Sequence, residues 1–204
     1  MLVKKWMLSL GLCLSAWMPI AGAVEYSHYR IDKSDYTFST VFDITHDKQP
    51  MGSVVKSVFH VATQYDLYNR FGLFEGHGAC HIFCLGFLYA WGAKIDVFNI
   101  DGDKVGLIDG QFFTKEPAKF NFYNEEDTCI AMAFLSSNCM EFCVVDPDNS
   151  ALVLARLSRN FVEDAVDNWD MVVYHPERIP LSMLKIFSAF ACDTQDQFNA
   201  EPPK

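Results

Sequence analysis

The chain has 204 residues, and its 16 Lys or Arg against 26 Asp or Glu give a formal net charge of −10 at pH 7. This length is that of one domain, and the hydrophobic half of the residues suffices for a core. Nucleic-acid binding depends on Lys and Arg that neutralise phosphates, so the acidic composition excludes a nucleic-acid partner. It argues equally against adsorption to anionic lipid.

The first 23 residues are typical of a Sec-type signal peptide. Two lysines near the start precede an apolar run over residues 6–20 and a small-x-small cleavage site over residues 21–23. We predict cleavage between Ala23 and Val24, which leaves 14 basic and 26 acidic residues, a net charge of −12, in a secreted or periplasmic protein. Retention of the segment as an anchor is the alternative, although its apolar run is short for a membrane span.

After the leader, most of the chain has the pattern of short strands separated by turns. Residues 36–45 alternate, with Tyr36, Phe38, Phe42 and Ile44 on one face. Further strand-like runs occupy residues 53–62, 64–68, 85–91, 95–100, 104–108, 112–113, 120–123, 129–135, 139–145, 151–157 and 168–174. The run 85–91 fits a buried strand or a short helix. Residues 72–78 are rich in glycine and carry no strand signal.

Six cysteines follow the leader: Cys80, Cys84, Cys129, Cys139, Cys143 and Cys192. An even number in an exported chain permits disulfides. Cys139 and Cys143 lie in a strand-like run, where their spacing spans about 13 Å, more than the about 7 Å that a disulfide allows. Cross-strand pairs stay open, as does the alternative that several of the six are small buried hydrophobic residues.

The segment from Leu181 to Cys192 is predicted to be a short buried helix. Pro180 suits a helix start, and only Ser182, Lys185 and Ser188 in the segment are not apolar. A helix that is apolar on all sides is buried, and about 12 residues reach only about 18 Å, less than the about 30 Å of a bilayer core. The alternative is an amphipathic helix on one side of a sheet, with the three polar residues as an outward stripe.

These elements predict a mainly β protein: a closed antiparallel barrel of about 12 strands around a central C-terminal hydrophobic helix. The predicted core of the helix consists of Leu181, Leu184, Ile186, Phe187 and Phe190. A two-layer α+β domain with the helix on an open sheet is the alternative. We expect a single domain over residues 24–198 and a disordered tail over residues 199–204.

Two segments resemble a known family. Residues 95–108 contain a strand, an Asp-Gly turn and a second strand with Val-Gly-Leu-Ile, and residues 169–193 contain a last strand and then the apolar helix. Both are similar to the tubby C-terminal-like superfamily, which includes LURF-one-related proteins and phospholipid scramblases. The resemblance covers residues 28–198 and implies a barrel around a buried helix. Members differ in function, and the sequence lacks the Lys/Arg cluster of the phosphoinositide-binding ones.

The most reactive group of side chains in the sequence is His77, Cys80, His81 and Cys84. Thiolates and imidazoles can bind Zn²⁺, and a Cys/His pair can act as nucleophile and base. The spacing is not that of a standard zinc site, and adjacent strand residues point to opposite faces. We therefore expect no metal, no cofactor and no catalytic residues here, and keep a metal-binding or hydrolytic role for these four residues as the alternative.

Asn99, Asp101 and Asp103 match part of a calcium-binding loop, but the glycine is misplaced and no glutamate closes the motif. We interpret them as a hairpin turn. The sequence contains no Gly-x-Ser-x-Gly, His-Glu-x-x-His or phosphate-loop motif. We therefore expect an exported, non-enzymatic module that binds a lipid, an apolar ligand or a protein partner and is not an integral membrane protein once the leader is removed. A secreted effector is a further hypothesis that the leader permits.

Overall fold

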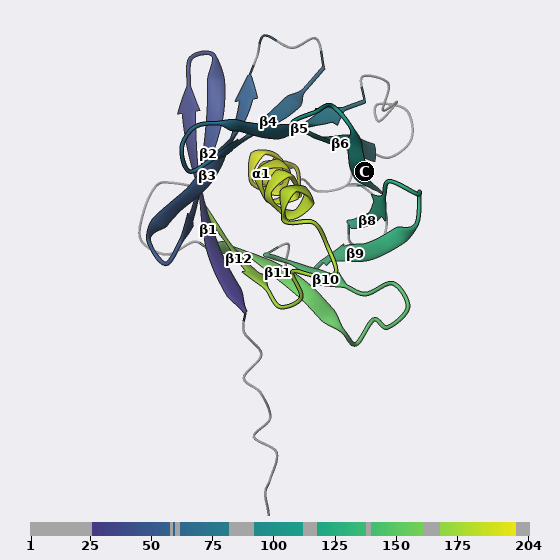
Figure 1. Cartoon of the computed structure of the whole chain (residues 1–204). Coiled ribbons are helices and arrows are strands. Elements are labelled where there is room, and N and C mark those ends of the chain that lie inside the picture. Colours follow the sequence, from purple (N-terminus) through teal and green to yellow (C-terminus); the bar gives the residue numbers. More distant parts are fainter. Residues whose placement is uncertain are drawn as a thin grey trace, which may run out of the picture.

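The structure is a computed structural model that describes residues 26–57, 59, 62–81, 92–111, 118–137, 140–160 and 168–198. These residues form a closed barrel of twelve antiparallel strands with one helix inside it (Figure 1). The elements are β1 (Ser27–Tyr36), β2 (Ser39–His46), β3 (Gln49–Ser57), β4 (Gln64–Asn69), β5 (Phe74–Cys80), β6 (Gly92–Asn99), β7 (Lys104–Gln111), β8 (Lys119–Asn124), β9 (Cys129–Leu135), β10 (Glu141–Val145), β11 (Val153–Asn160), β12 (Asn168–Val173) and α1 (Leu181–Phe198).

Each strand pairs with the next one in the sequence, and β1 pairs with β12 to close the sheet. A closed sheet has no edge that could pair with another chain. Because the strands alternate in direction, the turns after β2, β4, β6, β8 and β10 lie at one end of the barrel. Residues 174–180 lead into α1 from that same end, which we call the helix-start end. The other end is the helix-finish end.

The helix lies inside the barrel, as Figure 1 shows. Leu184, Ile186 and Phe187 have no exposed surface and Phe190 is 5% exposed, whereas Leu181 is only partly buried at the helix start. The predicted fold class, a closed antiparallel barrel around a C-terminal helix, is confirmed. The two-layer alternative is wrong, because strands surround the helix on all sides.

The polar residues of α1 do not form an outward stripe. Of the three polar residues in the predicted segment, Lys185 and Ser188 are buried and Ser182, in the first turn, is partly exposed. The Ser188 hydroxyl donates a hydrogen bond to the carbonyl oxygen of Lys185 over 2.8 Å, so its burial is compensated within the helix. Lys185 has no comparable bond among the described residues.

Aromatic rings fill the space between α1 and the strands. The ring centroid of Phe187 lies 5.2 Å from that of Phe120, 5.1 Å from that of Phe122 and 5.2 Å from that of Phe142, each in a T-shaped arrangement. T-shaped pairs bring the positive edge of one ring to the negative face of the other. The buried Trp169 continues the cluster, 6.1 Å from Phe142.

Two glycines allow the strands to approach the helix closely. A Cβ atom at Gly78 in β5 would lie 2.7 Å from Cγ2 of Ile186. A Cβ atom at Gly106 in β7 would lie 2.2 Å from the carbonyl oxygen of Tyr123 and 3.1 Å from Cε of Met183. The glycine-rich stretch that gave no strand signal therefore belongs to strand β5. At Gly78 this strand must lack an inward side chain, because the helix passes close to it.

The alternation of apolar and polar residues in the sequence also failed to predict the first strand, β1. In β1 the apolar inward residues Tyr29 and Ile31 are followed by Lys33 and Asp35, which weakens the alternation. The predicted run 36–45 spans a turn between β1 and β2. The leader over residues 1–23, its cleavage point at Ala23 and Val24, the runs 85–91 and 112–113 and the tail 199–204 lie outside the described residues.

Candidate functional site

The helix-start end is built from a turn that recurs at the ends of β4, β6 and β8. The last residue of each strand is an asparagine whose Oδ1 accepts two backbone N–H groups that follow it. Asn69 accepts from Phe71 (2.9 Å) and Leu73 (3.0 Å). Asn99 accepts from Asp101 (2.9 Å) and Asp103 (2.8 Å), and Asn124 accepts from Glu126 (3.1 Å) and Thr128 (2.8 Å). Asparagine commonly stabilises turns in this way, so this rim of the barrel is held by local bonds.

Two neighbouring turns on this rim present large apolar side chains to solvent. The side chains are Phe71, Leu73, Phe74 and Ile100, which are 71%, 63%, 36% and 63% exposed. We call these four residues the hairpin patch. The guanidinium of Arg70 lies over the Phe71 ring, 4.6 Å from its centroid. Contiguous exposed apolar side chains mark interaction sites more often than scattered ones.

A pocket of about 440 Å³ opens beside the hairpin patch. Its lining comes from β4, β5, the β6–β7 turn and the first turn of α1: Leu67, Asn69, Leu73, Phe74, Glu75, Ile100 and Ser182. Small-molecule sites occupy about 300–1,000 Å³ and combine mostly apolar walls with a few polar groups. The pocket here has a mostly apolar lining with a few polar groups, and it is shallow and widely open to solvent.

An ion pair joins Glu75, which lines the pocket, to the buried Lys185 of α1. Lys185 follows Ser182 by one helical turn, and its Nζ is 3.9 Å from Oε2 of Glu75. The lysine side chain is 8% exposed and the glutamate side chain 39%. Burial lowers the pKa of Lys185, and the negative charge of Glu75 only partly opposes that effect. The separation is too long for a hydrogen bond, so the two groups interact through their charges alone.

The first turn of α1 faces the same pocket through Ser182. The amides of Met183 and Leu184 donate to the carbonyl oxygen of Pro180 over 3.1 and 3.3 Å. The amides of Leu181 and Ser182 have no acceptor among the described residues, and the first turn contains no acidic residue. Helix starts carry a partial positive charge, which is here left without an acidic partner on the helix itself.

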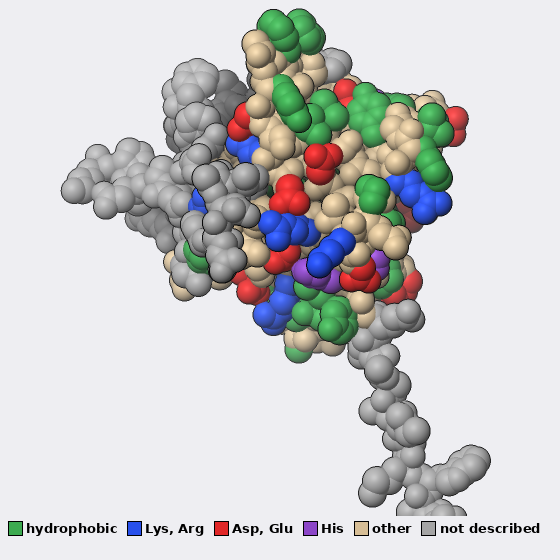
Figure 2. Space-filling view, turned by 90° about the vertical axis from the view of Figure 1, so that its left-hand side faces the viewer, with side chains coloured by type: hydrophobic (Ala, Val, Ile, Leu, Met, Phe, Trp, Pro, Cys, Tyr) green, Lys and Arg blue, Asp and Glu red, His purple; other side chains and the backbone are tan. Residues whose placement is uncertain are grey.

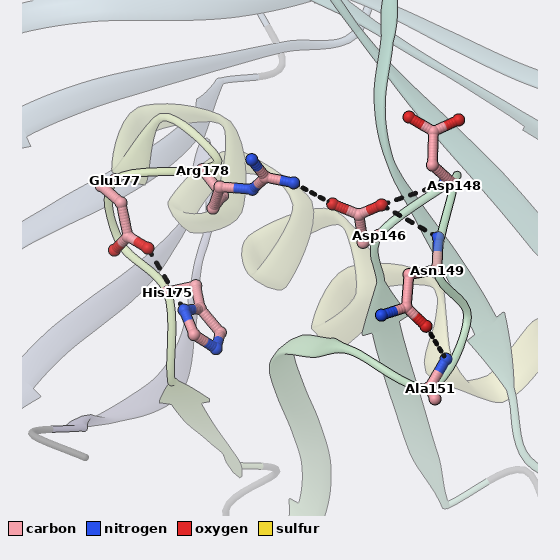
Figure 3. Close-up of polar contacts among 7 residues, drawn as sticks. All are labelled: Asp146, Asp148, Asn149, Ala151, His175, Glu177 and Arg178. Atoms are coloured by element: carbon pink, nitrogen blue, oxygen red, sulfur yellow. Dashed lines mark hydrogen bonds and ion pairs between the residues drawn. The ribbon is translucent and has the colours of Figure 1, made fainter. Parts of the chain in front are cut away.

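Residues 174–180, which precede α1, are fixed to the barrel by a polar clamp (Figure 3). Arg178 donates to the buried carboxylate of Asp146, which directly follows β10. The same carboxylate accepts the amides of Asp148 (3.0 Å) and Asn149 (3.1 Å). The hydrogen bond from Arg178 is the main reason why the pKa of Asp146 is lowered. The clamp fixes where the helix begins and engages both oxygens of the Asp146 carboxylate.

A second anchor holds the helix-finish end. Oδ2 of Asp193 accepts from Nζ of Lys56 (2.6 Å) and from the hydroxyl of Tyr65 (2.8 Å). Burial, and then the charge of Asp193, raise the pKa of the Tyr65 hydroxyl well above its usual range. Tyr65 therefore stays protonated and donates, which ties α1 to β3 and β4.

The three described residues of the predicted reactive group, His77, Cys80 and His81, do not form one cluster. His77 lies on the outer wall, where its ring stacks on Phe98 at 4.9 Å. Cys80 packs against the core, and Nε2 of His81 lies 2.5 Å from Oδ2 of Asp96. Cys84 lies outside the described residues. Within the described part of the chain, no group of three His, Cys, Asp or Glu could hold a metal ion.

The calcium-like residues belong to a hairpin turn, since Oδ1 of Asn99 is engaged by the backbone and Gly102 has the positive φ of +85° that the turn needs.

No disulfide joins any two of the described cysteines, which are Cys80, Cys129, Cys143 and Cys192. Cys84 and Cys139 lie outside the described residues. Burial raises the pKa of the thiols of Cys129 and Cys143.

The side of the barrel formed by β2 and β3 carries acidic and basic side chains intermingled (Figure 2). Neighbouring pairs on β1 follow the same rule: Arg30 lies 2.9 Å from Asp32 and Lys33 lies 3.6 Å from Asp35. The described residues of this face form no concentration of positive charge that would attract polyanions.

No model of a known protein family matches the chain, and no curated protein matches its sequence. Among the described helices, none has both the length and the apolar character required to cross a bilayer. The structure alone therefore defines the structural class, which is a closed twelve-stranded antiparallel barrel with an internal C-terminal helix.

Sequence reasoning did not find the hairpin patch or the pocket. Phe71, Leu73 and Ile100 stand in turn sequences, where apolar residues carry no periodic signal. One signal was available: Asn-Arg-Phe-Gly-Leu and Asn-Ile-Asp-Gly-Asp both begin with asparagine and have glycine three residues later. If both sequences had been recognised as the same type of turn, the two turns could have been placed next to each other at one end of the sheet.

Proposed function

We propose that the protein is an exported, non-enzymatic binding module with a tubby-like barrel, whose pocket at the helix-start end holds an apolar or amphiphilic ligand. The observation that carries the proposal is the coincidence of the 440 Å³ pocket with the hairpin patch. Four of the nine exposed large hydrophobic side chains among the described residues belong to that patch. Apolar walls supply affinity for a hydrocarbon chain through the area they remove from water.

The non-enzymatic part of the proposal is supported by the state of the reactive groups. A thiol must ionise to act as a nucleophile, and burial raises the pKa of Cys129 and Cys143. His81 is paired with Asp96 on the outer wall, next to Lys104 rather than a nucleophile. A binding role needs none of these groups, whereas the hydrolytic alternative would need several of them together.

Export is supported by the leader sequence and has a direct test. The protein expressed with its full sequence should be recovered outside the cytoplasm with an N-terminus at Val24, as intact mass measurement would show. Recovery in the cytoplasm with residues 1–23 still attached would contradict the proposed export. The binding proposal does not depend on this result.

The binding test uses the neutral dye Nile red and the neutral amphiphile 1-decanol, with the chain from Val24 onward. We expect saturable Nile red fluorescence that decanol displaces. The double variant Leu73→Ser, Ile100→Ser removes two exposed apolar walls without touching the core. Each side chain contributes about 1.5 kcal/mol when fully covered, so decanol affinity should fall at least about tenfold.

The matched control is Phe38→Ser. Phe38 is 59% exposed but follows β1 at the opposite end of the barrel, where its ring lies 5.6 Å from that of Phe59. Its replacement removes similar apolar surface and should leave decanol binding unchanged. Absence of saturable binding by the wild type, or an equal loss in the control, would refute a ligand site at the helix-start end.

A further inference from the structure

The turns that carry the hairpin patch, and the turn next to them, are acidic. The three turns over residues 70–73, 100–103 and 125–128 contain one basic residue, Arg70. Their acidic residues, which we call the acidic rim, are Asp101, Asp103, Glu125, Glu126 and Asp127, and all five are exposed. Cross-strand pairing of Gly76 with Asn99 and of Gly106 with Asn124 places the three turns side by side. The helix-start end therefore has an apolar patch bordered by negative charge.

The carboxylates of the acidic rim have no cationic partner among the described residues. A single side-chain hydrogen bond reaches them, from Nδ2 of Asn99 to Oδ2 of Asp103 over 3.4 Å. On the barrel wall, in contrast, Asp96 lies 2.9 Å from Nζ of Lys104. Exposed carboxylates are hydrated and need no partner for stability, so the consequence of the rim is the negative field that it creates beside the patch.

We propose that the helix-start end binds an amphipathic helix of a partner protein. The apolar side chains of that helix cover the hairpin patch and enter the pocket, and its Lys or Arg side chains face the acidic rim. This inference rests on the proposed function, because it names the kind of partner for the same site. Apolar residues spaced along one face of a helix are a common way to fill such a surface, and complementary charge sets the orientation and the rate of encounter.

The dimensions of the site suit a helix. Neighbouring strands lie about 4.8 Å apart, so four strand spacings, about 19 Å, separate the β4–β5 turn from the β8–β9 turn. About 13 helical residues span that length. Phe71 is 71% exposed and does not line the pocket, so only a partner that extends beyond the pocket can cover it. The apolar end of the bound helix lies at the hairpin patch and its basic end at residues 125–128.

The experiment measures fluorescence anisotropy of labelled peptides of about 14 residues, titrated with the chain from Val24 onward. The first peptide is an amphipathic helix of leucine and lysine. The second has glutamate in place of each lysine, and the third has the composition of the first in an order that gives no apolar face. We expect saturable binding of the first peptide, about tenfold or more weaker binding of the other two, and several-fold weakening of the first when the ionic strength rises from about 0.05 to about 0.3 M.

Two charge variants locate the interaction. Asp101→Asn with Glu125→Gln removes one charge from each of two turns and should weaken binding of the lysine peptide about threefold or more, with a smaller dependence on salt. The matched control, Asp35→Asn with Asp43→Asn, removes the same charge from exposed positions on β1 and β2 and should bind as the wild type does. The double serine variant of the hairpin patch should weaken binding about tenfold or more and keep the dependence on salt.

Equal affinities for the lysine and glutamate peptides, or equal losses in the two charge variants, would overturn the inference. The proposed function would then stand, provided that decanol binding still depends on Leu73 and Ile100. Flotation with phosphatidylcholine vesicles, without binding of the lysine peptide, would overturn the inference in favour of a membrane. If neither decanol nor the lysine peptide binds, both the inference and the proposed function fall. Should a charge variant not fold, the peptide comparison and its salt dependence in the wild type decide.

Discussion

Phe187 is the residue whose removal tests the architecture most directly. It has no exposed surface, and its ring makes T-shaped contacts with Phe120, Phe122 and Phe142 at centroid distances of 5.1–5.2 Å. Truncation of a buried phenylalanine to alanine costs about 3–5 kcal/mol, and each aromatic pair adds about 0.5–1.5 kcal/mol. Because β8, β10 and the helix meet at this ring, the space cannot collapse easily, and we expect Phe187→Ala to lose about 5 kcal/mol.

Such a loss is comparable to the whole stability of a domain, which is about 5–15 kcal/mol. It can be measured by urea unfolding, with the fluorescence of the buried Trp169 as the probe, since that ring is 6.1 Å from Phe142. Phe187→Leu should lose only about 2 kcal/mol, and the exposed Phe38→Ala less than about 1 kcal/mol. Phe187→Asp should give no soluble folded protein. A loss below about 2 kcal/mol in Phe187→Ala, at an unchanged dependence on urea, would refute burial of the helix in the barrel.

Three further predictions test other parts of the structure. Gly78→Ala should lower the free energy of unfolding by about 1–3 kcal/mol, because the new Cβ would lie 2.7 Å from Ile186; an unchanged urea midpoint would contradict the close approach of β5 to α1. Lys185→Met should raise the stability at pH 7 by about 1–2 kcal/mol, since a buried, poorly satisfied charge is replaced by an apolar chain of similar size. That gain should shrink as the pH rises from the lowered pKa of folded Lys185 towards about 10.5, where the unfolded lysine also loses its proton. Asp146→Asn should be less stable than the wild type at pH 7. The difference should shrink below about pH 4, because the Asp146 carboxyl then becomes protonated, first in the unfolded chain and at lower pH in the folded protein, where Arg178 lowers its pKa. Thermal melts at a series of pH values would show a constant difference if this account is wrong.

The fold could be predicted from the sequence because its decisive element carries its own signal. The run from Leu181 to Cys192 is apolar on nearly all sides and too short for a bilayer, so it needs a protein sheath, and the preceding segments alternate as strands do. What the pattern missed has a physical reason. Gly78 has no side chain where α1 passes, Gly76 has none where the backbone of β6 lies close, and a strand with two glycines on its inward face shows little alternation.

The site could not be predicted in the same way. Its walls come from Leu67, Phe74, Ile100 and Ser182, which are up to 115 positions apart in the sequence and meet only because the barrel closes around the helix. One of the two interpretations of the helix placed Lys185 on an outward, solvent-exposed stripe. Sequence periodicity alone does not distinguish an exposed lysine from a lysine that is covered by the wall of a barrel. The reactive group at residues 77–84 attracted attention by composition, whereas strand alternation separates His77 from Cys80.

The two ends of the helix differ in how their polar groups are satisfied, and this difference favours the start as the functional end. At the finish, Asp193 receives donors from two strands and Tyr65 stays protonated, so that end is internally complete. At the start, the clamp on Arg178 positions the first turn beside an open, mostly apolar pocket, and Lys185 is paired with Glu75 only over 3.9 Å. A barrel that only needed to bury its helix would be more stable with an apolar residue at position 185.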